Sequence, residues 1–337
     1  SRLDKTRNYW QNWLNIGSDK LNSIEPKYIG LTKKSLMIIK AHCDKRGGII
    51  ASGDSSIYNY GRDYYSYVWP RDSAYAIWPL IRMGYTEEPK KVFEFCRDII
   101  TKDGYLMHKY QPDKAIGSTW HPLLHGNRQE LAIQEDETAS ILYMLGEYYN
   151  YTKDLEFVES LYSTLIKPAA DFLANFIDET TRLPHASYDL WEEKFLTTTY
   201  TSAVTYQALC VAENLASAFN HADDEVTWGE ASRLILSKAH DFFDDEKKIL
   251  VKGFLLNNDG TRSFDSTLDI SSFYGAFMYG LITDQTIVDQ TFCNIERSLL
   301  NISPSGGSAR YENDQYFKSE PAYMGNPWFV TTLWIAQ

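Results

Sequence analysis

Stretches of helical periodicity, joined alternately by short and long connections, limit the folds open to this chain of 337 residues. Apolar residues recur at three- and four-residue spacing, which is typical of amphipathic helices. A leading helix is predicted over Arg2–Ile16. Further helices are predicted over Leu31–Asp44, Arg71–Met83, Glu87–Ile100, Asp136–Tyr149, Asp154–Ile177, Tyr200–Phe219, Glu225–Phe243, Ser271–Leu281, Thr286–Leu300 and Pro327–Ala336. The pattern predicts an all-α protein.

The long connections contain many aromatic residues and glycines, and they follow every second helix. Loops of this length in a compact domain are usually functional or disordered, and these are too aromatic to be disordered. They are Gly47–Trp69, Gly104–Gln134, Leu183–Thr199, Val251–Asp269 and Ser303–Gly325. Helix pairs joined in this way predict a toroid of helical hairpins with its long links on one face.

The composition excludes some partners and leaves others open. A net charge of -12 argues against nucleic acid and against an anionic membrane surface. No apolar stretch is long enough to span a bilayer, and the first residues do not resemble a signal peptide. The cysteines, Cys43, Cys96, Cys210 and Cys293, form no Cys-x-x-Cys pattern. They are predicted to be buried free thiols, which favours a cytoplasmic over a secreted protein.

Neither a metal nor a cofactor is expected. His121 and His125 are four residues apart, but Pro122 and Gly126 argue against the helix that would direct both rings at one ion. No glycine-rich phosphate loop and no serine nucleophile motif stands out. The aromatic content of 15% fits either large core residues or a sugar-binding site, where rings stack on pyranose faces.

The segment Ser187–Lys194 carries two adjacent carboxylates, Glu192 and Glu193, directly after Trp191. A neighbouring apolar ring removes water from a carboxyl group and raises its pKa, which keeps the acid protonated near neutral pH. Hydrolysis of a glycosidic bond requires such an acid, because the departing sugar oxygen must be protonated. Taken alone, the segment also fits an ordinary helix start or an exposed turn.

Three other charged segments could contribute to a site. Arg71 and Asp72 open a predicted helix and could recognise sugar hydroxyls, or they could form a helix cap with a local ion pair. Ser308–Asp314 is a charged and aromatic loop. Gln134–Thr138 places three carboxylates in a first helical turn, where acidic residues are common, so a structural role is favoured there.

Three ordered motifs resemble the glucoamylase family of glycoside hydrolases (family 15), prokaryotic type. They are Trp69-Pro-Arg-Asp72, Tyr188-Asp-Leu-Trp-Glu-Glu193, and Arg310-Tyr311 followed by Gly325-Asn-Pro-Trp-Phe329. The resemblance implies an (α/α)6 barrel over residues 21–337 behind a leading linker helix at 1–20. It also implies inverting, exo-acting hydrolysis of α-linked glucosides such as starch and malto-oligosaccharides from the non-reducing end, which releases β-glucose.

The resemblance also assigns roles to residues. Glu192 corresponds to the general acid, and Glu193 to a residue that assists substrate binding and holds the environment of the acid. The remaining residues implied to bind substrate are Tyr65, Trp69, Arg71, Asp72, Leu190, Trp191, Arg310 and Trp328. All are expected to converge on one pocket.

Two departures from the family pattern qualify these assignments. Glu130 stands where the fungal members have a tryptophan, so the subsite beyond the scissile bond is in doubt. The catalytic base of the family follows the Asn-Pro-Trp motif at a distance that residues 1–337 do not reach. The chain is therefore expected to lack the final helices of the barrel and its base, with Glu312 and Glu320 as the nearest substitutes.

Several alternatives stay open. Glucodextranases and trehalases share the family, although trehalase-like members tend to carry Gly-Ile-Trp-Glu-Val where this chain has Asp189-Leu-Trp-Glu-Glu193. A non-catalytic glucan-binding protein is an alternative of another class, and it would be consistent with an absent base. The oligomeric state is left open.

Overall fold

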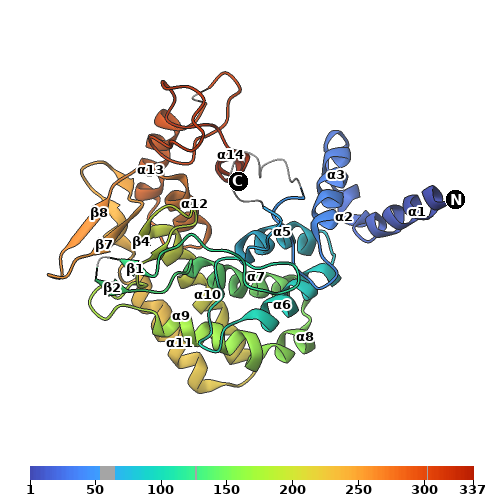
Figure 1. Cartoon of the computed structure of the whole chain (residues 1–337), viewed down its shortest axis with the longest axis horizontal. Helices are drawn as coiled ribbons and strands as arrows, with labels where there is room; N and C mark the ends of the chain where they lie inside the picture. The colour runs from blue at the N-terminus through green and yellow to red at the C-terminus, as the bar shows by residue number, and fades with distance from the viewer. Residues whose placement is uncertain (54–64, 126, 302) are drawn as a thin grey trace. The chain divides into compact units, whose positions relative to one another are not determined.

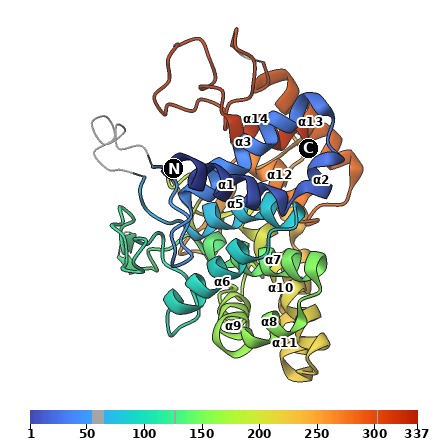
Figure 2. The same cartoon turned by 90° about the vertical axis from the view of Figure 1, so that its right-hand side faces the viewer.

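The computed structural model describes residues 1–53, 65–125, 127–301 and 303–337 (Figure 1, Figure 2). Its α-helices are Arg2–Asn15 (α1), Ser18–Asn22 (α2), Pro26–His42 (α3), Pro70–Arg82 (α5), Glu87–Ile99 (α6), Glu135–Thr152 (α7), Leu155–Ser160 (α8), Lys167–Asn175 (α9), Thr199–Ala218 (α10), Ala222–Leu236 (α11), Ile270–Met278 (α12), Gln285–Ser298 (α13) and Phe329–Ala336 (α14). Its strands are Leu124–His125 (β1), Arg128–Gln129 (β2), Ser187–Tyr188 (β3), Phe195–Thr198 (β4), Phe243–Asp244 (β5), Ile249–Leu250 (β6), Gly253–Leu256 (β7) and Arg262–Asp265 (β8). Every helix predicted from periodicity overlaps a helix of the structure.

Two predicted helices are wrong in extent. The segment Asp154–Ile177 is not one helix but α8, a π-helical turn at Tyr162–Ile166, and α9. Pro168 has no N–H to continue the α-helical ladder, so the chain changes its hydrogen-bonding pattern just before it. The helix predicted to reach Phe243 ends at Leu236, and a short 3-10 helix covers Ala239–Phe242.

The connection predicted over Val251–Asp269 contains a β-hairpin, formed by β7 and β8. The chain turns at Asp259-Gly260, a dipeptide that is typical of hairpin turns. The strands are only four residues long, so their alternating pattern is too short to stand out in the sequence. Of the connection predicted over Gly47–Trp69, positions 54–64 lie outside the described residues.

The chain divides into two compact units, which each combine two segments. One unit consists of residues 1–125 and 140–172, and the other of residues 126–139 and 173–337. The helix α7 begins in the second unit and continues in the first. The division into a linker helix and one barrel domain stays a prediction.

In the first unit, the leading helix α1 is fixed to α3 and α6 by a buried polar contact. The indole N–H of Trp13 donates to Glu88 Oε1 at 3.0 Å, and Lys40 Nζ lies 2.5 Å from the same oxygen. Burial alone would raise the pKa of Glu88. The hydrogen bonds from Lys40 and Trp13 outweigh burial and hold that pKa below its usual range. The ring of Trp13 also packs against Tyr85, with 4.3 Å between centroids.

In the second unit, α10 packs against both α11 and α12 (Figure 1, Figure 2). Beside these helices lies an antiparallel sheet in the order β3-β4-β7-β8. Gly253 allows β7 to approach β4 closely, because a Cβ there would lie 2.4 Å from the carbonyl oxygen of Thr197. The strand β4 leads directly into α10, where Thr198 Oγ1 caps the helix by accepting from the N–H of Thr201. The sheet therefore fixes the connection between β3 and β4 in relation to α10.

The cysteines only partly match their prediction. All four are free, but Cys96 alone is fully buried, Cys43 and Cys210 are half-buried, and Cys293 is exposed. Cys293 lies on the surface of α13 rather than in the core. Among the described residues, no helix combines the length and the apolar character that crossing a bilayer would require.

Candidate active site

The carboxylates Glu192 and Glu193 lie in a loop of six residues, Asp189–Lys194, which joins β3 to β4 and is here called the acid loop. Strand pairing of Tyr188 with Phe195 closes the loop at its base. The side chain of Asp189 holds it from inside, since Oδ1 accepts from the backbone N–H groups of Glu193 at 2.8 Å and Lys194 at 3.0 Å. The backbone N–H of Glu192 donates to the carbonyl of Asp189 at 2.8 Å.

Glu192 adopts a left-handed backbone conformation, with φ at +64°. A side chain other than glycine in this region costs about 1–2 kcal/mol, because Cβ crowds the following carbonyl oxygen. Such strain persists only where the surrounding contacts determine it, and it concentrates at functional sites. The hydrogen bonds to Asp189 supply that determination here.

Glu193 is held by two side chains from the Ser308–Asp314 loop. Its Oε1 lies 2.9 Å from an Nη of Arg310, and its Oε2 accepts a short hydrogen bond from the hydroxyl of Tyr311. Arg310 is itself buried and forms a fork with Asp314, through two contacts of 2.7 Å. The contact between Arg310 and Glu193 joins residues 117 positions apart in the chain.

Aromatic rings surround the guanidinium of Arg310. Its Cζ lies 5.1 Å from the ring centre of Trp191 and 4.8 Å from that of Trp328. The indole N–H of Trp328 is buried and has no acceptor among the described residues. Leu190, within the acid loop, is buried. The structure thus brings together six of the predicted residues, namely Leu190, Trp191, Glu192, Glu193, Arg310 and Trp328.

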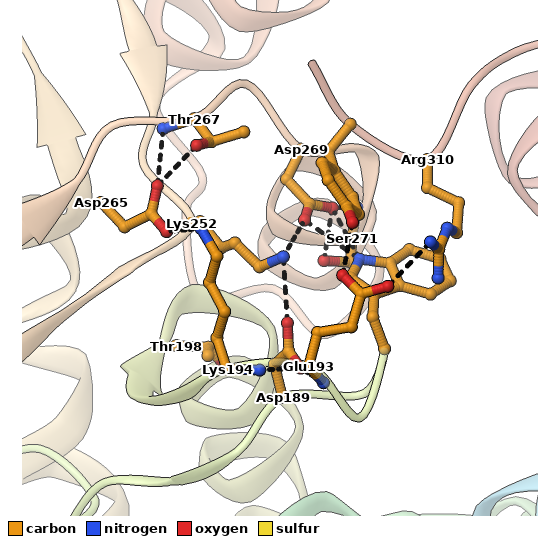
Figure 3. A network of polar contacts seen from close by, with 12 residues as sticks. Asp189, Glu193, Lys194, Thr198, Lys252, Asp265, Thr267, Asp269, Ser271 and Arg310 are labelled. Atoms are coloured by element: carbon orange, nitrogen blue, oxygen red, sulfur yellow. Dashed lines mark hydrogen bonds and ion pairs between the residues drawn. The ribbon is translucent and has the colours of Figure 1, made fainter. Parts of the chain in front are cut away.

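Sequence reasoning missed a buried lysine and a second aspartate beneath the acid loop. Lys252 Nζ lies 2.9 Å from Asp189 Oδ2 and 3.3 Å from Asp269 Oδ2, and all three side chains are buried (Figure 3). Asp269 also accepts from the indole N–H of Trp191, at 3.0 Å through Oδ2 and 3.2 Å through Oδ1. Asp269 could have been recognised from the sequence as the N-cap of α12, because aspartate is a preferred N-cap residue and directly precedes the apolar run of this helix. In the structure its Oδ1 accepts from the N–H of Ser271.

The other predicted residues gather at the start of α5 in the first unit. Trp69 is the N-cap residue, and Arg71 and Asp72 follow in the first turn. The ring of Tyr65 stacks on Trp69 with 5.7 Å between centroids. Buried Lys109 places its Nζ 5.0 Å from the centre of the same indole. That these residues and the acid loop line one pocket stays a prediction.

The acidic first turn of α7 is more buried than the sequence indicates. Glu135, Asp136 and Glu137 are all fully buried, although first-turn carboxylates usually face solvent. Burial raises the pKa of Glu135 well above its usual range, and the negative charge of Asp136 adds to that rise. Only Oε1 of Glu135 has a partner among the described residues, the hydroxyl of Thr205 at 3.2 Å. In the folded protein Glu135 is therefore favoured as the neutral acid.

Replacing Glu135 by glutamine is expected to stabilise the protein at neutral pH. The folded protein retains a proton on Glu135 that the unfolded chain releases above about pH 4.3. Stability therefore falls as pH rises from that value towards the folded pKa, and an amide removes this loss. Thermal denaturation between pH 4 and pH 8 should show a higher Tm for Glu135→Gln at pH 7, with the difference narrowing towards pH 4.

The matched control is Asp223→Asn, which removes an exposed first-turn carboxylate from α11. Its Tm should follow that of the unmodified protein at every pH. A Tm for Glu135→Gln at or below that of the unmodified protein at pH 7 would contradict the raised pKa.

Comparison with known proteins decides the family. The family-wide sequence profile of "Glycosyl hydrolases family 15" matches residues 30–337. The chain belongs to this family.

In the part of the chain that the structure describes, no group of three or more His, Cys, Asp or Glu side chains is arranged to hold a metal ion.

Similar curated proteins are consistent with this membership. The chain of this family 15 member is 31% identical over 313 residues to an uncharacterized glycosyl hydrolase of Methanocaldococcus jannaschii, covering 92% of the chain and 45% of that protein. It is 24% identical over 315 residues to Trehalase 2 of Sulfolobus acidocaldarius, covering 86% of the chain and 50% of that protein. The chain thus spans about half the length of these relatives.

Solved structures of glucoamylases share the fold. A bacterial glucoamylase complexed with acarbose aligns with a TM-score of 0.74 at 19% identity, covering 98% of this chain and 50% of that one. The glucoamylase from Saccharomycopsis fibuligera aligns with a TM-score of 0.68 at 19% identity, covering 95% and 71%. The predicted fold class, all-α of the (α/α)6 type seen in glucoamylases, is confirmed.

Proposed function

We propose that this family 15 protein is an exo-acting, inverting α-glucosidase of the glucoamylase type, which releases β-glucose from the non-reducing end of starch and malto-oligosaccharides. The observation that supports it most is the acid loop. Two adjacent carboxylates lie in a loop that the buried side chain of Asp189 holds. One of them, Glu193, contacts Arg310 through one oxygen and Tyr311 through the other. The other, Glu192, has a left-handed backbone conformation that its hydrogen bond to the carbonyl of Asp189 helps to fix.

In this proposal Glu192 donates its proton to the glycosidic oxygen as the bond to the anomeric carbon breaks. A water molecule attacks the opposite face of the sugar and passes its proton to a second carboxylate, which in inverting enzymes lies about 6.5–9.5 Å from the acid. Glu193 is unsuited to that second role, because its two oxygens are occupied by Arg310 and Tyr311. Glu312 is also disfavoured, since its Oε2 accepts from the backbone N–H of Leu268 at 3.0 Å.

Substrate recognition is assigned to the groups at the start of α5 and around Arg310. Trp69 and Tyr65 offer a stacked aromatic pair against which a pyranose can lie. Asp72 and Arg71 offer acceptors and donors for hydroxyls. The indole N–H of Trp328, which has no acceptor among the described residues, offers a further donor.

A product assay of the full-length gene product tests the proposal. Maltose, isomaltose, dextran, starch and trehalose are supplied separately, and the anomer of the released glucose is followed by NMR. Release of β-glucose from maltose and starch supports the glucoamylase type. The 24% identity to Trehalase 2 makes trehalose the first alternative substrate, and cleavage of trehalose alone would replace the proposal with that activity. Binding of maltose without any turnover would favour a glucan-binding protein instead.

Asp72→Ala is expected to weaken substrate binding and to lower kcat/KM. Its hydroxyl contacts would serve substrate and transition state alike, so about 1.5–3 kcal/mol per charged hydrogen bond is lost from both, and kcat changes little. We expect kcat/KM on maltose to fall by at least tenfold per lost bond, with KM rising. The control is Asp103→Asn, which removes an exposed carboxylate of the same unit and should leave kcat/KM unchanged. Normal KM for Asp72→Ala would contradict the assigned contact with substrate.

A further inference from the structure

Lys252 is almost completely buried, with 2% of its side chain exposed, in the turn between β6 and β7. Its Nζ contacts the carboxylates of Asp189 and Asp269 (Figure 3). It also lies 4.2 Å from the ring centre of Tyr311. Lysine is rarely buried to this extent unless its charge is paired.

Each of these neighbours holds a different part of the acid loop. Asp189 accepts the backbone N–H groups of Glu193 and Lys194. Asp269 accepts the indole N–H of Trp191. Tyr311 donates its hydroxyl to the carboxylate of Glu193. The single ammonium of Lys252 therefore contacts three side chains that each hold a part of the loop.

The charges around Lys252 keep it ionised. Burial alone would lower the pKa of Lys252, but Asp269 and Asp189, with a further contribution from Glu193, outweigh burial and raise it. Two carboxylates share one cation, so neither can move away without leaving buried charge unpaired, which is costly in a low-dielectric interior.

A second ion pair joins the same hairpin to the loop. Lys194, the last residue of the acid loop, pairs with Asp265 at the end of β8 through a short contact. Asp265 and Gly253 are paired across the hairpin, so Asp265 and Lys252 lie at the same end of β7–β8. This end of the hairpin thus contacts the acid loop through two ion pairs.

We propose that Lys252 is a positioning residue for the general acid. Lys252 fixes the acid loop by holding Asp189, Asp269 and Tyr311 in one arrangement. Its consequence for turnover rests on the proposed function, whereas its consequence for the geometry of the loop does not. A displacement of about 1 Å in a catalytic group can lower turnover by about 10²-fold.

Three variants of the full-length protein test the proposal. Lys252→Met removes the ammonium and retains the length of the side chain. Lys252→Arg retains the charge. Lys252→Met combined with Asp189→Asn removes the Lys252–Asp189 ion pair without a change in net charge and keeps the Oδ1 acceptor for the loop amides. It therefore provides a second variant in case the single variant misfolds. The matched control is Arg262→Met, a change on the same hairpin. It breaks the ion pair of Arg262 with Asp241 and leaves the contacts of the acid loop unchanged.

Two readouts are made on each variant. Kinetics on maltose separate kcat from KM, and amide hydrogen exchange with mass spectrometry follows the peptide that contains residues 189–194. We expect Lys252→Met and the double variant to lower kcat by about 10²-fold with KM within threefold, and to speed exchange in that peptide. Lys252→Arg should recover at least tenfold of the lost kcat, and Arg262→Met should match the unmodified protein in both readouts.

The outcomes separate the two proposals. A double variant with kcat within threefold of the unmodified protein would overturn the positioning role, since Lys252 would then only neutralise Asp189. Unchanged exchange in residues 189–194 would overturn it as well. If the unmodified protein hydrolyses none of the glucosides, the proposed function fails, and the exchange measurement alone decides the role of Lys252.

Discussion

Glu192→Gln is expected to lower kcat for glucose release by about 10²- to 10⁴-fold, the range that one positioned proton donor contributes. The amide is nearly the same size as the acid but has no proton to give to the leaving oxygen. Substrate binding should survive, because the recognition contacts assigned to Trp69, Asp72 and Arg310 are not altered. The variant should therefore retain KM or inhibitor affinity while losing turnover.

The matched control is the adjacent variant Glu193→Gln. It weakens a charged contact with Arg310 and a hydrogen bond with Tyr311, so it should raise KM more than Glu192→Gln does. Kinetics on maltose, with an equilibrium binding measurement for a slowly hydrolysed inhibitor, distinguish the two patterns. Near-normal turnover of Glu192→Gln would remove the acid from Glu192 and direct attention to other carboxylates.

Arg310→Leu is expected to lower the free energy of unfolding by about 3–5 kcal/mol, which is typical when one partner of a buried ion pair is removed. Asp314 is fully buried, and its two oxygens accept from Arg310. Without the guanidinium, the backbone N–H of Tyr316 would be the one remaining donor to the side chain of Asp314 among the residues that the structure describes. Glu193 would lose its cation in the same step.

Urea denaturation followed by circular dichroism measures this loss. Arg310→Leu combined with Asp314→Leu should recover a large part of it, because the unpaired buried charge is gone. Arg233→Leu is the control, since Arg233 pairs with Glu213 at the surface of the same unit and should change stability by less than about 1 kcal/mol. A loss below about 1 kcal/mol for Arg310→Leu would show that the fork does not support the fold.

The helices and the motif residues could be predicted from the sequence because each leaves a local trace. Periodic apolar residues marked α10 and α13 to within one or two positions at each end. The ordered motifs marked Glu193 and Arg310 as members of one site, and the structure joins them at 2.9 Å. Periodicity failed where the local pattern was short, as in the hairpin β7–β8, or where Pro168 interrupted a continuous apolar stripe.

The polar groups beneath the acid loop left no comparable trace. A lysine before a short strand is most often a solvated residue, and nothing near Lys252 in the sequence indicates two buried carboxylates as partners. Asp189 lies 63 positions before it and Asp269 lies 17 after it, by subtraction of residue numbers. Their meeting depends on the order β3-β4-β7-β8, which is a property of the sheet and not of any one segment.

The hairpin β7–β8 contacts the acid loop by ion pairs at one of its two ends. Lys252 and Asp265 lie at the end where Gly253 pairs with Asp265. The turn at Asn257–Thr261 closes the other end with its own hydrogen bonds, and Figure 1 shows the hairpin as β7 and β8. Peptides, labels or binding epitopes inserted at that turn would leave unchanged the end of the hairpin that contacts the acid loop. A binder raised against the turn would contact the hairpin at the end that lies away from its ion pairs with the acid loop.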